Sequence, residues 1–239
     1  MGSAALWGLI SASSLLLGAL VGLRVRLTDR VHGLLLGFGA GALISAVGVE
    51  LALEGLAEGS VLVLSVGLAV GALLFVGGNL VLERRGPGRE RRVADGAAVA
   101  GGALALGALL DGVPESAAIG LGLAQGDGVG VALVAAVFLS NFPESVGAAH
   151  DARRAGTPAA AVLRLWTGIV LACVVACVLG RELLGGGGEP VAFVQGLAAG
   201  GILAMLADTM IPEAYEHGGR AVGLVTVLGF TVALALSQA

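Results

Sequence analysis

Charged side chains are scarce in this sequence, and lysine is absent altogether. Only 13% of the 239 residues are charged, whereas 57% are hydrophobic and 42 are glycine, and the mean hydropathy is +0.98. No soluble core of this size needs so many apolar residues, so this composition excludes a soluble globular domain and predicts a polytopic membrane protein. The strong preference for Ala, Gly, Val, Leu and Arg is typical of a GC-rich prokaryotic genome.

Cysteine and aromatic residues are also few. Cys173 and Cys177 are the two cysteines and lie four residues apart in one apolar run, where a disulfide would need closer and better-directed Cβ atoms. We therefore expect small packing residues there, with soft metal ligands as the alternative. The arginine-rich stretch 84–92 lacks interleaved aromatics, so it gives no support to nucleic-acid binding and favours a loop that orients the chain in a membrane.

Apolar runs long enough to cross a bilayer follow one another along the whole chain. Residues 4–23 lack the basic start of a signal peptide and are expected to form the first span. All arginines except Arg181 follow odd-numbered runs, so by the positive-inside rule the loops after these runs are cytoplasmic. We therefore predict one all-α transmembrane domain over 1–239, multi-pass in the cytoplasmic (inner) membrane, with both termini outside and eight helices near 4–23, 31–53, 61–82, 96–124, 128–149, 159–180, 190–214 and 220–238.

Two internal repeats accompany these runs. Residues 40–54 in the second run resemble 199–213 in the seventh, at an offset of 159, and the two predicted helices run in opposite directions. A shorter repeat relates the fourth and fifth predicted helices, which are also oppositely directed. Like segments in opposite orientation indicate an inverted-topology repeat, whose interface usually holds a substrate near the membrane midplane.

The shorter repeat places acids in the middle of the membrane. It consists of the phrases DGVPES at 111–116 and SNFPES at 140–145. An ionised side chain at this depth costs several kcal/mol unless it faces a partner, a cavity or an ion. On a helix Asp111 and Glu115 lie one turn apart on one face, and so do Ser140 and Glu144. Each proline removes a hydrogen-bond donor, which should kink its helix and free a carbonyl oxygen beside the acids.

Carboxylates, a hydroxyl, an amide and free carbonyls are the ligands that hard and borderline divalent cations prefer. Three acids this close repel one another unless a cation or protons intervene. The alternative is that protonated acids merely bridge helices. Glu54, Glu58, Glu216 and His217 lie near span ends, where we expect them to be solvated, and His32 is expected at the interface. The sequence predicts a metal site formed by Asp111, Glu115, Ser140, Asn141 and Glu144, with Glu50, Asp208 and Glu213 as weaker candidates for the ion path.

At these residues the chain resembles the ZIP (Zrt/Irt-like) family of divalent metal-ion transporters, in its prokaryotic type. That family has eight spans with both termini outside, and its fourth and fifth helices carry His-Asn-x-Pro-Glu-Gly-type motifs that bind metal. The stretch ADTMIPE at 207–213 is also similar to the family's seventh-helix pattern. The resemblance implies that Asp111, Glu115, Ser140 and Glu144 take the positions of the primary ligands and Asn141 that of a neighbouring ligand.

The sequence also departs from the family pattern. Asp111 and Ser140 replace the two motif histidines, Gly112 replaces an asparagine, and the sixth run lacks the carboxylate that binds a second metal in some relatives. Zn²⁺, Mn²⁺, Fe²⁺ and Cd²⁺ are the candidate cations, and loss of imidazole shifts the expected preference away from Zn²⁺ toward Mn²⁺ or Fe²⁺. We expect a carrier, not an enzyme, with no prosthetic group and a divalent cation as cargo. Two alternatives stay open, a non-transporting ZIP-like protein and a proton-coupled carrier of an organic solute, and so does a homodimer.

Overall fold

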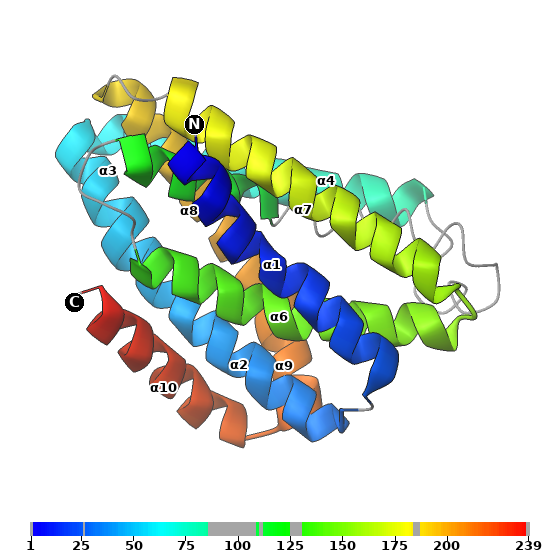
Figure 1. Ribbon diagram of the computed structural model, residues 1–239. Helices are drawn as coiled ribbons and strands as arrows, with labels where there is room; N and C mark the ends of the chain where they lie inside the picture. The colour runs from blue at the N-terminus through cyan, green and yellow to red at the C-terminus, as the bar shows by residue number, and fades with distance from the viewer. Residues whose placement is uncertain are drawn as a thin grey trace.

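The computed structural model describes residues 2–25, 27–85, 109, 112–124, 131–183 and 187–237, which are helical apart from short turns and contain no strand. Figure 1 shows the helices gathered into one bundle. Between α4 and α6, residues 112–124 form a further helical segment. The other elements are α1 (Gly2–Arg24), α2 (Asp29–Ala46), η1 (Val47–Ala52), α3 (Leu53–Glu58), α4 (Val61–Arg85), α6 (Val131–Arg154), α7 (Ala159–Leu183), α8 (Glu189–Met205), η2 (Leu206–Met210), α9 (Ile211–Gly218) and α10 (Ala221–Leu236).

Six helices in the described part of the chain are long and apolar enough to cross a membrane. They correspond to the predicted first, second, third, fifth, sixth and seventh spans, and two of them, Asp29–Glu58 and Glu189–Gly218, are built from three consecutive helical elements. The predicted eighth span is a shorter apolar helix, Ala221–Leu236, and most of the fourth, 96–124, lies outside the described residues. The chain is therefore an all-α, multi-pass membrane protein.

Two arginines donate hydrogen bonds between helix ends, one at each end of the bundle. Arg153, near the end of α6, donates to the carbonyl of Leu23 at the end of α1. Arg181, near the end of α7, donates to the hydroxyl of Ser3 at the start of α1. Thus α1 and α6 end together, whereas α7 ends beside the start of α1, as helices that cross a membrane in alternating directions require.

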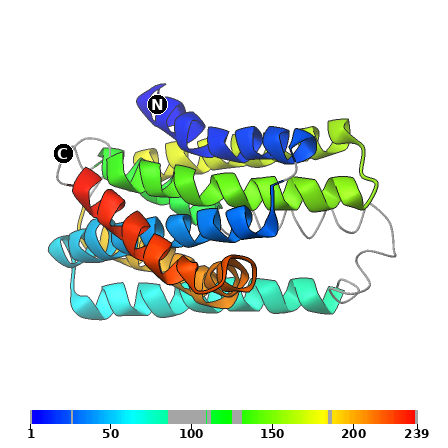
Figure 2. The same cartoon turned by 90° about the horizontal axis from the view of Figure 1, so that it is seen from below.

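Small residues allow the helices to approach closely. Helix α1 packs against both α6 and α7, α10 lies along α2, and α4 packs against α8. In Figure 2, α4 and α1 lie along opposite edges of the bundle. A Cβ atom on Gly18 would overlap the Ser145 hydroxyl and the Phe142 carbonyl of α6, and one on Gly22 would overlap the Val146 carbonyl. Glycine at these positions is what lets α1 lie directly against the backbone of the helix that carries the second acid motif.

Two π-helical segments interrupt the spans that the longer repeat relates. Segment η1 begins at residue 47 and η2 at residue 206, positions that differ by the same 159 residues as the sequence repeat. The terminal pieces pack crosswise, α3 against α8 and α9 against α2. π-Helical turns are rare and occur frequently at functional sites, so matching ones indicate that the repeat extends to local structure.

Candidate functional site

The two acid motifs meet where the segment 112–124 approaches α6. Ser140, Asn141 and Glu144 lie on α6, which continues as a helix through Pro143. Glu115, Ser140 and Asn141 are all buried, with exposed fractions of 0%, 1% and 3%, and Glu144 is half-buried. The charge of Glu144 and the polar side chain of Asn141 both act on the Glu115 carboxylate, so three of the predicted ligands lie close together. Asp111, a fourth, lies outside the described residues.

Glu115 is the unusual member of this group. Both of its carboxylate oxygens are buried without a hydrogen-bond partner in the described part of the chain. A carboxylate left in this state loses its hydration without compensation, which costs several kcal/mol if it is ionised. Its nearby acid, Glu144, makes the cost larger through like-charge repulsion. This position therefore requires a positive charge, either a bound cation or a proton.

Close packing of α2 against α6 holds the residues around Ser140 in place. A Cβ atom on Gly39 of α2 would lie 2.8 Å from the Cα of Ser140 and 3.1 Å from the carbonyl oxygen of Leu139, the oxygen whose helical donor Pro143 lacks. The Ser140 hydroxyl donates to the Val137 carbonyl at 3.0 Å, within its own helix. Close contact with α2 thus holds this face of the motif and leaves the serine oxygen with acceptor capacity.

The structure adds Cys173 of α7 to the surroundings of the site. This free cysteine is 1% exposed, its thiol interacts with the Ser116 side chain, and the charge of Glu115 acts on the thiol. Its Sγ would lie 2.9 Å from a Cβ atom on Gly112. The sequence predicted a packing role for both cysteines, and the tight contact with Gly112 agrees with that role. The pairing of α7 with residues 112–124 is a long-range contact that spacing along the chain does not reveal.

The three acids predicted for the ion path lie on η1, η2 and α9. Glu50, 7% exposed in η1, accepts a hydrogen bond from the backbone N–H of Leu133 at 3.1 Å and so caps the first turn of α6. This contact lies roughly 10 Å along α6 from Ser140, at about 1.5 Å per residue. Asp208 is exposed in η2 and accepts from the Asn79 amide at 3.3 Å. Glu213 is half-buried in α9.

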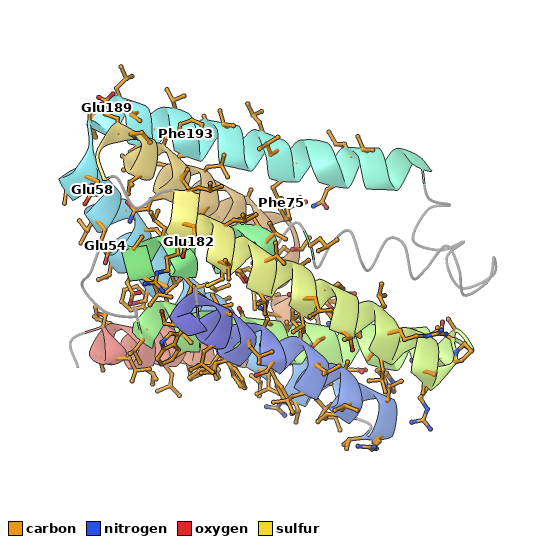
Figure 3. The ribbon with its side chains drawn as sticks, turned by 45° about the horizontal axis from the view of Figure 1, so that its top comes forward. Glu54, Glu58, Phe75, Glu182, Glu189 and Phe193 are labelled. Atoms are coloured by element: carbon orange, nitrogen blue, oxygen red, sulfur yellow. The ribbon has the colours of Figure 1, made fainter. Side chains whose placement is uncertain are left out.

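Four glutamates gather at the end of the bundle where α3, the end of α7 and the start of α8 meet, as Figure 3 shows for Glu54, Glu58, Glu182 and Glu189. Glu58 is half-buried and accepts from the Gly188 N–H at 2.7 Å, and the exposed Glu54 accepts from the Gln195 amide at 3.3 Å. These bonds hold α3 on the start of α8. Two of the four acids therefore have a structural role at this end.

Within the described ranges, no group of three or more His, Cys, Asp and Glu side chains is placed to hold a metal ion. A cation at Glu115 would thus depend on oxygen atoms of Asn141, Ser140, the backbone or water as well as on the acids. No protein-family model matches the chain, and no curated protein matches it. The resemblance to metal transporters therefore remains an expectation from the two acid motifs in the sequence.

Proposed function

We propose that this protein carries divalent metal cations across the membrane into the cytoplasm and that the cation binds at Glu115 and Glu144. The observation that carries the proposal is the Glu115 carboxylate, fully buried with neither oxygen hydrogen-bonded in the described residues. A divalent cation would offset both the lost hydration and the repulsion between the two acids. Buried ionisable groups inside a membrane usually belong to ion or proton pathways.

The donor atoms favour oxygen-preferring metals. The buried group offers two carboxylates, the Asn141 amide oxygen and the Ser140 hydroxyl, and it lacks imidazole. Such ligands suit Mn²⁺ or Fe²⁺ better than Zn²⁺ or Cd²⁺, although Cys173 beside Ser116 provides a softer atom nearby. We therefore propose Mn²⁺ and Fe²⁺ as the preferred cargo.

We place the movement of alternating access at the repeated π-helical segments. Each interrupts a span whose last piece packs on the first piece of the repeat-related span. In transporters built from inverted repeats, one group of helices moves against the other around a central site. Helix ends joined through weaker π-helical turns are suitable points for that movement.

Uptake by purified protein in proteoliposomes tests the proposal. Glu115→Gln and Glu144→Gln should each reduce Mn²⁺ uptake at least tenfold, whereas Glu216→Gln, which changes an exposed acid on α9, should leave uptake unchanged. Retention of uptake in both site variants would contradict the assignment of the site.

A second function is favoured by the absence of a third His, Cys, Asp or Glu ligand among the described residues. In this case Glu115 holds a proton, bridges the helices through Asn141, and the protein is ZIP-like but does not transport. Wild-type proteoliposomes that take up none of Mn²⁺, Fe²⁺, Zn²⁺ and Cd²⁺ would select this function. Uptake of an organic solute with protons would instead select the remaining alternative.

A further inference from the structure

Two of the three histidines lie together at the opposite end of the bundle from the four glutamates. His32 lies in the first turn of α2 and His217 in the last turn of α9, and these two helices pack against each other. The ring centroids are 6.0 Å apart and the ring planes are inclined by 58°. Both rings are half-buried, so they are held in place and still accessible to small ions. This end is the one that the arginine distribution predicts to be cytoplasmic.

Each ring is also fixed by a backbone carbonyl. Nε2 of His32 lies 3.0 Å from the carbonyl oxygen of Pro143, and Nδ1 of His217 lies 2.9 Å from that of Glu213. Because a carbonyl only accepts, both of these nitrogens must carry the proton. The neutral rings then keep one unprotonated nitrogen each, Nδ1 of His32 and Nε2 of His217. Metal-binding histidines are typically held in this way, with the second ring nitrogen donating to a carbonyl or carboxylate.

The spacing suits one shared ion. Two imidazoles that bind the same tetrahedral Zn²⁺ at about 2.0–2.1 Å have ring centroids roughly 5–5.5 Å apart. The observed separation is within about 1 Å of this range, a difference that small rotations of the two side chains would close. Face-to-face stacking of the rings is not present, since the planes are strongly inclined.

We propose that His32 and His217 together bind a borderline divalent cation such as Zn²⁺, with water in the remaining positions. Imidazole nitrogen suits Zn²⁺, Co²⁺, Ni²⁺ and Cu²⁺, in contrast to the oxygen-rich site at Glu115. Two protein ligands and exchangeable water make a site that holds an ion loosely and releases it. The proposal rests on its own contacts and stands whether or not the protein transports metal.

The position of His32 couples this histidine site to the central site, the candidate cation site at Glu115 and Glu144. Its hydrogen bond reaches Pro143, the residue before Glu144, and a Cβ atom on Gly147 would lie 2.6 Å from its ring. An ion that reorients the His32 ring would therefore act on the same turn of α6 that carries the central acid. This contact gives the histidine pair a direct physical route to the occupancy of the Glu144 site.

Chemical footprinting of the full-length protein in detergent tests the pair. Diethylpyrocarbonate modifies unprotonated imidazole nitrogen, and mass spectrometry reads each histidine separately. At a free Zn²⁺ concentration ten times Kd, modification of His32 and His217 should slow about tenfold by mass action. His150, half-buried on α6 and outside any three-residue metal cluster, serves as the internal control and should be unaffected.

Variants separate this site from the central site. His217→Gln should abolish the protection of His32, whereas Glu115→Gln should leave the protection of both histidines intact. Calorimetric titration with Zn²⁺ should lose one bound ion in His217→Gln relative to His150→Gln. Equal protection of all three histidines, protection of His32 that survives His217→Gln, or an unchanged Zn²⁺ stoichiometry would overturn the proposal. Protection that disappears in Glu115→Gln would also overturn it, because the ion would then belong to the central site.

Discussion

Replacement of Glu115 by glutamine should make the metal-free protein more stable. The wild-type carboxylate is 0% exposed, and neither oxygen has a hydrogen-bond partner among the described residues. Leaving a buried polar group unsatisfied costs about 1–3 kcal/mol, and more for a charged group. Glutamine has nearly the same shape, removes the repulsion from Glu144 and can donate an N–H to the nearby Asn141 amide oxygen. We expect a gain of about 2 kcal/mol in the free energy of unfolding.

That gain corresponds to a measurable change in melting temperature. For a chain of this length, 1 kcal/mol shifts Tm by about 2–4 °C, so Glu115→Gln should melt about 4–8 °C higher than wild type without metal. Added metal should reverse this difference in melting temperature, because it stabilises wild type more than the variant. At one hundred times Kd, Mn²⁺ should stabilise wild type by about 2.7 kcal/mol, or about 5–11 °C, and the variant by less than about 1 °C.

Thermal unfolding followed by tryptophan fluorescence provides the assay, because Trp166 is 2% exposed and reports loss of packing in the core. Glu216→Gln, an exposed acid, is the matched control and should behave as wild type with and without Mn²⁺. A Glu115→Gln protein that melts lower than wild type without metal, yet keeps its full shift with Mn²⁺, would refute the reasoning. Such a result would mean that the carboxylate stabilises the fold through neutral contacts.

Two further predictions concern how the site is held. Gly18→Ala should destabilise the protein by about 1–3 kcal/mol, because the new Cβ overlaps the backbone of α6. Gly223→Ala is the control and should be neutral or stabilising, because no atom lies within 4 Å of the new Cβ. Equal melting temperatures for the two variants would contradict this prediction. Glu50→Ala should lower the free energy of unfolding by about 1–3 kcal/mol, because it leaves the buried N–H of Leu133 unsatisfied. Glu50→Gln should recover most of this loss. An unchanged Tm in Glu50→Ala would show that this cap contributes nothing to stability.

The spans were the predictable part of the fold, because the thickness of a bilayer sets the length of an apolar helix and hydropathy reports it directly. The described helices match six predicted spans, and Ala221–Leu236 lies within the predicted eighth. Local hydropathy does not reveal where a π-helical segment interrupts an α-helix. A helix with a π-helical segment has the same apolar content as a regular one, so η1 and η2 left only an indirect sign in the sequence, the repeat that places them 159 residues apart.

The central site was predictable in part because its residues lie in two short motifs on consecutive predicted helices. Helical spacing alone put Ser140 and Glu144 on one face. The contacts of Cys173 with the Glu115 region, of Glu50 with Leu133 and of His32 with Pro143 join elements far apart in the chain. No periodicity links such pairs, since they depend on which helices become neighbours and at what height they cross.

Comparison with the other acids of this chain shows that the hydrogen bonding of Glu115 is unusual. Glu50 accepts from the backbone of α6, Glu58 from the backbone before α8, Glu54 from the Gln195 amide, and Asp208 from the Asn79 amide. Each of these carboxylates has a protein donor, although all four are more exposed than Glu115 and therefore lose less of their hydration. The fold gives these four acids hydrogen-bond donors, yet it leaves both oxygens of the Glu115 carboxylate without a hydrogen bond among the described residues, with the Asn141 side chain nearby. This arrangement leaves the charge of Glu115 to a cation or a proton. The position of the missing donor is therefore a stronger indication of function than the number of acids around it.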